Sequence, residues 1–223
     1  MITLETELYI TQLQQWPKSG RHIMGQFDDN SIIVYQAYNP SIANYAVQHQ
    51  KFGGHDFSWT RMTWIKTNFT WMMYRSGWAT KPNQERILAI KLSRQGFEEI
   101  LSEAVLTSLD QFNDTSSSNM KSLQKEWKQQ LNSSQVRLQW DPDHNLLTEK
   151  MQRRAIQLGL KGDILKKYSN EWIISIEDIT EFVSEQYELI KLNKLDEVRT
   201  PVEQVYELCD NSLKGKLGMI NNN

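Results

Sequence analysis

Residues 57–79 read FSWTRMTWIKTNFTWMMYRSGWA, a stretch that predicts a strand followed by a capped helix. The alternation in residues 61–66 predicts a short strand, because successive strand side chains point to opposite faces. One face carries Met62, Trp64 and Lys66, and the other carries Arg61, Thr63 and Ile65. Thr67 or Asn68 is suited to cap a helix that continues to about residue 74, and Gly77 is suited to end it.

Aromatic rings and positive charges are concentrated in this stretch. The chain has eight tryptophans, and four of them lie here: Trp59, Trp64, Trp71 and Trp78. Trp71 and Arg75 are four residues apart and share one side of the predicted helix. Arg61, Lys66 and Arg75 lie in a segment that is apolar enough to be buried, and a buried cation requires a carboxylate, a phosphate or a group of carbonyls.

Two interpretations of this stretch are open. The helix start near residues 67–68 carries a partial positive charge that favours anions, so the stretch can form a cleft for a phosphate-bearing aromatic ligand such as a nucleotide. Alternatively, it is a Trp-rich core whose arginines pair with internal carboxylates.

The rest of the chain mixes strands and helices without regular alternation. Residues 31–38 (SIIVYQAY) predict a buried strand, followed by a helix with Asn39 as N-cap and Pro40 at its first position, ending near residue 52. Further strands are predicted at residues 21–27, 86–93, 136–140, 154–160 and 171–176. Further helices are predicted at residues 96–107, 120–131, 162–168 and 179–192, with a last helical turn from residue 200. This pattern favours an α+β fold.

The length of 223 residues suits one core and is short for two domains. We expect an N-terminal arm at residues 1–20, loose or helical, and a single α+β domain at residues 21–210. Within that domain, residues 108–133 are predicted to form an inserted Ser-rich loop and a surface helix. Residues 211–223 are predicted to form a flexible tail.

Composition narrows the functional class. The net charge of −2 gives no global basic field for nucleic acid. The chain has one cysteine, Cys209, which excludes an internal disulfide and fits a reducing compartment. The start lacks the features of a signal peptide, and no run is long enough to cross a bilayer, so we expect a cytoplasmic or nuclear protein without a membrane partner.

Common catalytic signatures are absent from the sequence. The four histidines have no metal-ligand spacing, so no metal site is predicted. G-x-S-x-G, Walker A and G-x-G-x-x-G motifs do not occur. The polar residues Gln36 and Tyr38, late in a buried strand, occupy a common site position, although Gln36 can equally satisfy backbone groups at the strand end. Glu171, at the start of a predicted strand, is by itself a weak candidate.

Several blocks of the sequence together resemble the family called domain of unknown function 4291. The resemblance covers about residues 21–210, and its most specific block is the middle one. The blocks are VYQAYNPSIANYAV (34–47), RMTWIKTNFTWMMYRSGWA (61–79), QERILAI (84–90), VRLQWDPD (136–143), RRAIQLGL (153–160) and WIISIEDIT (172–180). The family name implies no function.

A weaker resemblance is to the ADP-ribosyltransferase superfamily. Residues 168–174 (YSNEWII) are similar to the block that holds the catalytic Glu in poly-ADP-ribosylating members, and residues 31–38 and 61–66 are similar to the first and second motif strands. The resemblance implies split, mostly antiparallel sheets flanked by helices around an NAD cleft. The chain departs from the pattern at Gln36, where His or Arg is usual, and at the second motif position, where Thr63 and Trp64 both fall.

The superfamily resemblance implies roles for particular residues. Glu171 would hydrogen-bond the nicotinamide ribose and stabilise an oxocarbenium-like transition state, with Gln36 as the second catalytic position. Arg61 or Arg75 would hold the pyrophosphate of the cofactor NAD. The implied NAD-binding residues are Tyr35, Tyr38, Arg61, Thr63, Trp64, Lys66, Trp71 and Arg75. The acceptor of ADP-ribose is not defined.

Two other functions are open. The chain can be a non-catalytic module that binds a nucleotide or single-stranded nucleic acid through stacked tryptophans and local arginines. It can also be a structural or interaction protein whose Trp cluster is plain core. That function predicts that Trp71 and Trp78 are buried, with Arg61 and Arg75 paired to internal carboxylates.

Overall fold

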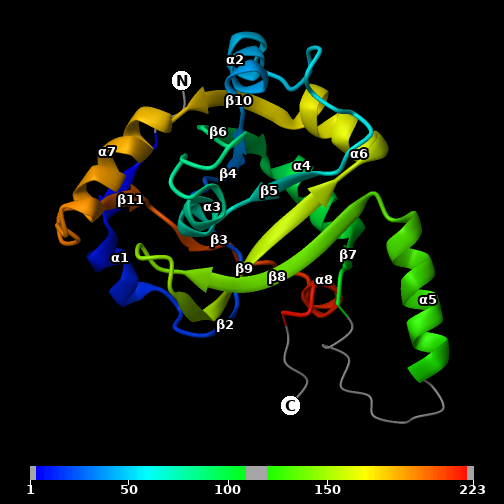
Figure 1. The fold of residues 1–223 in the computed structure, drawn as a ribbon. Coiled ribbons are helices and arrows are strands. Elements are labelled where there is room, and N and C mark those ends of the chain that lie inside the picture. Colours follow the sequence, from blue (N-terminus) through cyan, green and yellow to red (C-terminus); the bar gives the residue numbers. More distant parts are fainter. Residues whose placement is uncertain (1–3, 109–119, 220–223) are drawn as a thin grey trace.

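The central feature of the computed structural model is a mixed sheet in the order β10-β6-β4-β5-β9-β8-β7, with β2 beside β9 (Figure 1). The structure describes residues 4–108 and 120–219. The sheet strands are β2 (Gly20–Arg21), β4 (Ser31–Tyr38), β5 (Thr63–Lys66), β6 (Arg86–Ser93), β7 (Ala104–Leu106), β8 (Val136–His144), β9 (Lys150–Leu160) and β10 (Ile173–Asp178). Neighbouring strands are antiparallel except for the pairs β7–β8 and β2–β9.

Two small sheets and a set of helices surround the central sheet. β1 (Thr6–Leu8) pairs with β11 (Arg199–Pro201), and β3 (Met24–Gly25) pairs with β12 (Gln204–Val205). The α-helices are α1 (Tyr9–Gln15), α2 (Pro40–His49), α3 (Phe69–Ser76), α4 (Arg94–Glu103), α5 (Met120–Ser133), α6 (Gly162–Lys167), α7 (Thr180–Lys191) and α8 (Asn211–Lys216). A π-helical turn, η1 (Tyr168–Trp172), joins α6 to β10. The predicted α+β architecture, rich in antiparallel strands, is confirmed.

The central sheet consists of two halves that meet at one point. β4 pairs with β6 along its whole length, and β5 pairs with β9 along its whole length. β4 and β5, in contrast, are in register only at Tyr35 and Lys66. Beyond this pair the two strands diverge, and the missing ladder leaves room for a pocket.

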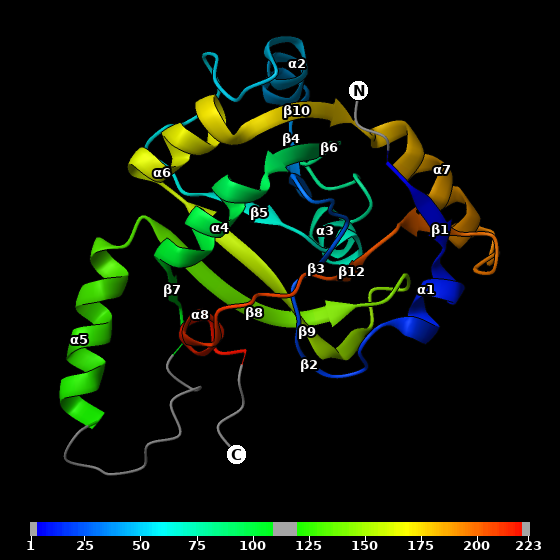
Figure 2. The same cartoon turned by 180° about the vertical axis from the view of Figure 1, so that it is seen from behind.

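Each face of the sheet is covered by helices, which explains why β4 and β6 are almost continuously apolar (Figure 2). Ile32 and Val34 belong to the core shared with α2, α4 and α6. Ile33 and Tyr35 point to the other face, into the core shared with α1, α3 and α7. The strand alternation therefore divides the apolar residues between two cores.

The strongest local predictions are confirmed. β4 and β6 have the predicted bounds. The side chain of Asn39 accepts a hydrogen bond from the backbone N–H of Ile42, and that of Asn68 accepts one from Trp71, so both predicted N-caps are present. Gly77 ends α3 with a φ of 61°, a left-handed conformation that favours glycine.

Several boundary predictions are wrong, each because of a contact distant in sequence. The strand expected to stop at Asp141 continues through Pro142. At Pro142, β8 pairs with β9 on one side only, because β7 pairs with β8 at residues 136–138. A proline can occupy this position because no described strand on the other side requires a backbone N–H from it. Residues 200–201 form a strand because they pair with β1. The predicted helix at 96–107 ends at Glu103, and residues 104–106 form β7, which pairs with β8. The predicted strand at 21–27 is divided between β2 and β3.

Both chain ends are more ordered than expected. The arm forms β1 and α1, and it buries Tyr9 and Trp16. The expected flexible tail contains α8, after which Leu217 is buried and its carbonyl accepts a hydrogen bond from Trp140 Nε1 at 2.8 Å. The predicted surface helix is α5, whereas residues 109–119 of the Ser-rich loop lie outside the described residues. None of the described helices has the length and apolar character required to span a membrane.

Candidate functional site

A pocket of about 810 Å³ opens where β4 and β5 diverge. β4, β5, α3 and the segment before β5 contribute side chains to it, and β8 and β9 form its far wall. It brings together seven of the predicted site residues: Gln36, Tyr38, Arg61, Thr63, Trp64, Lys66 and Arg75. Three others, Tyr35, Trp71 and Glu171, do not line it.

The far wall of the pocket is a row of polar side chains across three strands. Lys66 is in register with Gln157, which is in register with Gln139. The amide groups of Gln139 and Gln157 each donate a hydrogen bond of 2.7 Å to Asp141. The two glutamines were not predicted as site residues, although a polar residue between Ile156 and Leu158 in a buried strand was a usable signal.

Lys66 is the buried cation of the pocket. Its side chain is largely hidden from solvent, and its Nζ donates a hydrogen bond of 3.2 Å to the carbonyl of Trp64. No ion pair joins it to a carboxylate in the described parts of the chain. Burial, together with the positive charge of Arg75, lowers its pKa to about 7, while Asp141 opposes the shift.

Arg61 and Arg75 add two exposed cations to the same pocket. Neither forms an ion pair with any residue that the structure describes. Arg75 lies near enough to Lys66 to shift its pKa. Two guanidinium groups without protein carboxylates are available to an anion that enters the pocket.

The start of α3, predicted to attract a ligand anion, is occupied by the protein's own carboxylate. The backbone N–H of Phe69 donates a hydrogen bond of 2.5 Å to Glu203, and the side-chain amide of Asn68 donates another of 2.9 Å. Glu203 satisfies the first free N–H group of the helix, and it follows β11, far away in sequence. The prediction of a ligand anion there is therefore wrong.

Gln36 bridges the gap between the two halves of the sheet. Its amide donates hydrogen bonds to Thr63 Oγ1 at 2.8 Å and to the carbonyl of Trp64 at 3.3 Å. Its amide oxygen accepts a hydrogen bond of 2.8 Å from the Tyr168 hydroxyl. Burial raises the pKa of Tyr38, whose hydroxyl also contacts this cluster, to about 12. Gln36 therefore replaces the missing ladder with side-chain hydrogen bonds.

Two of the four clustered tryptophans, Trp71 and Trp78, are buried in the core. Trp71 is buried and contacts the rings of Tyr74 and His144, and Trp78 is buried and stacks on Tyr187. Tyr35 is buried on the opposite face of β4 from Gln36 and contacts Phe69. Of the four clustered tryptophans, only Trp64 lines the pocket. Trp71 and Trp78 thus fit the core interpretation, whereas the exposed Trp59 does not. Arg61 and Arg75, which form no ion pair with a described residue, do not fit it either.

Glu171 is exposed on η1 and is absent from the pocket lining. It precedes β10, whose first residue pairs with Leu92 of β6, and Leu92 pairs in turn with Ile32 of β4. Gln36 is in register with the other end of β10, because both Gln36 and Asp178 pair with Leu88. The side chain of this turn that reaches Gln36 is that of Tyr168.

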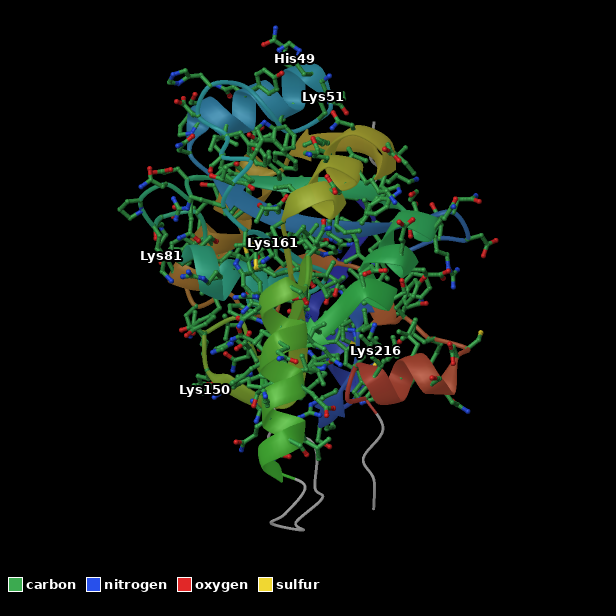
Figure 3. All side chains as sticks on the ribbon, turned by 90° about the vertical axis from the view of Figure 1, so that its right-hand side faces the viewer. His49, Lys51, Lys81, Lys150, Lys161 and Lys216 are labelled. Carbon is green, nitrogen blue, oxygen red and sulfur yellow. The ribbon has the colours of Figure 1, made fainter. Side chains whose placement is uncertain are left out.

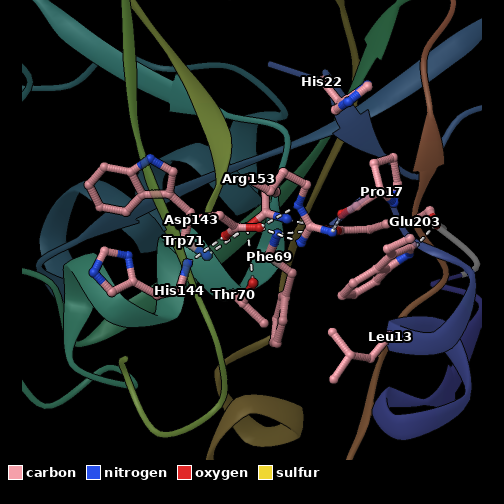
Figure 4. Close-up of polar contacts among 12 residues, drawn as sticks. Leu13, Pro17, His22, Phe69, Thr70, Trp71, Asp143, His144, Arg153 and Glu203 are labelled. Atoms are coloured by element: carbon pink, nitrogen blue, oxygen red, sulfur yellow. Dashed lines mark hydrogen bonds and ion pairs between the residues drawn. The ribbon is translucent and has the colours of Figure 1, made fainter. Parts of the chain in front are cut away.

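A second polar centre is fully buried and was not predicted (Figure 4). The guanidinium group of Arg153 donates to Asp143 through Nε, at 2.9 Å, and through Nη2. It also donates to the carbonyl of Pro17 at 3.1 Å and lies 4.9 Å from the ring of Trp16. This centre therefore fastens the N-terminal arm to the β8–β9 hairpin.

Glu203 is close to this pair, and burial together with the charge of Asp143 raises its pKa to about 8. The N–H of Phe69 and the charge of Arg153 oppose this shift. Gln12 connects the arm to the same segment, because its side chain donates to Thr200 Oγ1 and accepts from the backbone N–H of Glu203. The arrangement ties together both chain ends, which indicates a structural role.

Comparison with known proteins assigns the chain to a family. No curated protein matches the sequence. A family model, in contrast, covers most of the chain, including β4, β5 and the pocket between them. The chain belongs to the family described as "Domain of unknown function (DUF4291)", whose model matches residues 22–206.

Proposed function

We propose that the pocket between β4 and β5 binds a nucleotide-type small molecule through its phosphates. The observation that carries this proposal is the unpaired cation Lys66, buried in a pocket that Arg61 and Arg75 also line. A buried ammonium without a carboxylate is unfavourable unless it loses its proton or meets an anion. A phosphate or diphosphate suits two guanidinium groups and an ammonium.

The remaining lining supports an aromatic or sugar group on the same ligand. Trp64 and Tyr38 are partly exposed, and the buried Phe57 supports Tyr38 with ring centres 6.2 Å apart. Partly exposed rings can stack on a base, and the amides of Gln139 and Gln157 are suited to ribose hydroxyls. A volume of about 810 Å³ lies in the usual range for ligand pockets.

Lys66→Met and Arg75→Gln are each expected to weaken ADP binding by about tenfold to a hundredfold, since each removes a charge-assisted hydrogen bond. The affinity of the unaltered protein is expected to fall as pH rises above about 7. The unliganded Lys66 loses its proton there, and anion binding must then recover that proton. Lys66→Met is expected to abolish this pH dependence. Isothermal titration calorimetry above about pH 7.5, where the ADP charge is constant, measures both effects.

Lys150→Met is the matched control, because Lys150 is exposed and does not line the pocket. Equal affinity for ADP in Lys66→Met, Arg75→Gln and Lys150→Met would contradict the proposal. Titration with a single-stranded oligonucleotide separates the two ligand classes. Tighter binding of the oligonucleotide, with a steep salt dependence, identifies single-stranded nucleic acid as the ligand instead.

A second candidate function is ADP-ribosyl transfer from NAD to an acceptor. The observation in its favour is that the units β4–α2 and β5–α3 flank one pocket, at the point where the sheet divides. This arrangement fits the split sheet of ADP-ribosyltransferases that the sequence resembles.

The exposed, free Cys209 fits a reducing compartment, and we propose the cytoplasm or the nucleus as the location.

Transfer chemistry requires a carboxylate beside the nicotinamide ribose. The superfamily resemblance assigns it to Glu171, whereas the carboxylate that lines the pocket is that of Asp56. If the resemblance holds, Glu171→Gln abolishes nicotinamide release from NAD, measured by chromatography, and Asp56→Asn leaves it unchanged. If nicotinamide release is lost in Asp56→Asn and not in Glu171→Gln, Asp56 is the catalytic carboxylate instead. No release and no NAD binding at millimolar concentration would exclude the enzyme function and the cofactor.

A further inference from the structure

Lys66 differs from the other lysines that the structure describes. It is the buried one among them, whereas lysines such as Lys51, Lys150 and Lys216 are exposed (Figure 3). Lys66 nevertheless lines an open pocket. A largely buried amine at the wall of a pocket is poorly hydrated but can meet a ligand that enters the pocket, which is the usual setting of a nucleophilic lysine.

The groups around Lys66 increase the share of its neutral amine form near neutral pH compared with an exposed lysine. Burial and the charge of Arg75, on α3, lower its pKa to about 7, and Asp141, on β8, opposes them only in part. The Nζ donates one hydrogen bond, to the carbonyl of Trp64. A neutral amine with this single partner has a lone pair and the freedom to attack an electrophile.

We propose that Lys66 is a covalent nucleophile that forms an imine with an aldehyde or ketone carrying a phosphate or carboxylate group. The anionic group would be held by Arg61 and Arg75, so this inference rests on the proposed anion-binding function. It goes beyond that function because it assigns a bond-forming reaction to the pocket. It also narrows the ligands to anionic carbonyl compounds, a class that includes open-chain sugar phosphates.

The reaction balances without an oxidant or a reductant. The neutral Nζ attacks the carbonyl carbon, and a C–N bond forms as the π electrons of the carbonyl move to its oxygen. A proton moves from nitrogen to oxygen to give a carbinolamine. A second proton, from solvent in the open pocket, allows the hydroxyl to leave as water while the nitrogen lone pair forms the C=N bond. One neutral amine, one carbonyl and one proton thus give one protonated imine and one water.

Pyridoxal 5′-phosphate is a suitable probe, because it combines an aldehyde with a phosphate. The full-length protein is incubated with a limiting amount of the probe, reduced with borohydride and analysed by peptide mass spectrometry. Lys66 is expected to be labelled at least about tenfold faster than Lys51, Lys150 or Lys216. Its labelling rate is expected to level off above about pH 7, whereas the rate at exposed lysines continues to rise toward their higher pKa.

Two comparisons test the assigned geometry. Pyridoxal, which lacks the phosphate, is expected to lose the preference for Lys66, and Arg75→Gln is expected to reduce that preference with the phosphorylated probe. Lys66→Met removes the labelled site, and circular dichroism checks that this variant is folded. The labelling of the unaltered protein is informative whether or not the variant folds.

The result that overturns the inference is labelling of Lys66 at or below the rate of exposed lysines, or a rate that keeps rising above pH 8. If ADP still binds in a Lys66- and Arg75-dependent manner, only the nucleophile is excluded, and the pocket remains an anion site. If neither ADP binding nor selective labelling occurs, the proposed function and the inference both fail.

Discussion

Replacing Arg153 by methionine lowers the free energy of unfolding by about 3–5 kcal/mol, because the substitution leaves the carboxylate of Asp143 buried without its cation. Both side chains are inaccessible to solvent. The substitution also removes the hydrogen bond to the carbonyl of Pro17 and the contact with the ring of Trp16. The N-terminal arm is therefore expected to loosen first. Urea unfolding followed by tryptophan fluorescence measures the loss.

Arg154→Met is the matched control, since Arg154 is the next residue, is exposed, and makes no ion pair with a described residue. It is expected to change the free energy of unfolding by less than about 0.5 kcal/mol. The double variant Asp143→Asn, Arg153→Met lacks the buried, unpaired carboxylate of Asp143, and it is expected to be more stable than Arg153→Met alone. A single variant Arg153→Met within about 1 kcal/mol of the unaltered protein would show that the buried pair is not required.

Replacing Gln36 by leucine lowers the free energy of unfolding by about 1–3 kcal/mol, because it leaves the buried hydroxyl of Tyr168 without its acceptor and removes two further buried hydrogen bonds. The hydroxyl of Tyr168 loses its acceptor, and Thr63 Oγ1 and the carbonyl of Trp64 lose a donor. Beyond Tyr35 and Lys66, the bonds from Gln36 to Thr63 and Trp64 join β4 to β5, together with the contact between the Tyr38 hydroxyl and Thr63 Oγ1. Chemical unfolding and ADP titration are both expected to detect the loss of the Gln36 bonds.

Gln84→Leu is the control for this variant, because Gln84 also lines the pocket but its side chain makes no hydrogen bond to a described residue. A double-mutant cycle with Tyr168→Phe isolates the bond between Tyr168 and Gln36. The two substitutions together are expected to cost less than their sum, since each alone leaves one unpaired partner. Strict additivity would show that the bond between Tyr168 and Gln36 contributes no stability. Equal stability of Gln36→Leu and Gln84→Leu would show that Gln36 does not bridge the halves.

Elements specified by local chemistry were predictable from the sequence. The continuous apolar run of β4, the caps at Asn39 and Asn68, and Gly77 after α3 each depend on residues within a few positions of one another. The same holds for the strand–helix unit β5–α3, which places Lys66 and Arg75 beside the pocket. Family membership followed from the same blocks of sequence.

Features that depend on pairing between distant segments were not predictable. The anion at the start of α3 is Glu203, more than a hundred residues away, and no local pattern indicates it. The sequence could not show which face of α3 lines the pocket. The structure places the side chain of Trp71 against His144, outside the pocket lining. Glu171 shows the same limit, since the register of β10 decides at which end of the sheet it lies.

By itself, the sequence determined that the stretch 57–79 forms a strand and a capped helix that carry three cations, because periodicity and capping are short-range effects. Only the tertiary structure decided what those cations face. β4 and β5 meet at one residue pair and then diverge, and β8 and β9 supply a polar wall. Lys66 is therefore buried in a pocket without a carboxylate partner among the described residues, while three of the four tryptophans lie outside that pocket. Burial and charge pairing depend on what surrounds a side chain in space, and chain neighbours do not specify it.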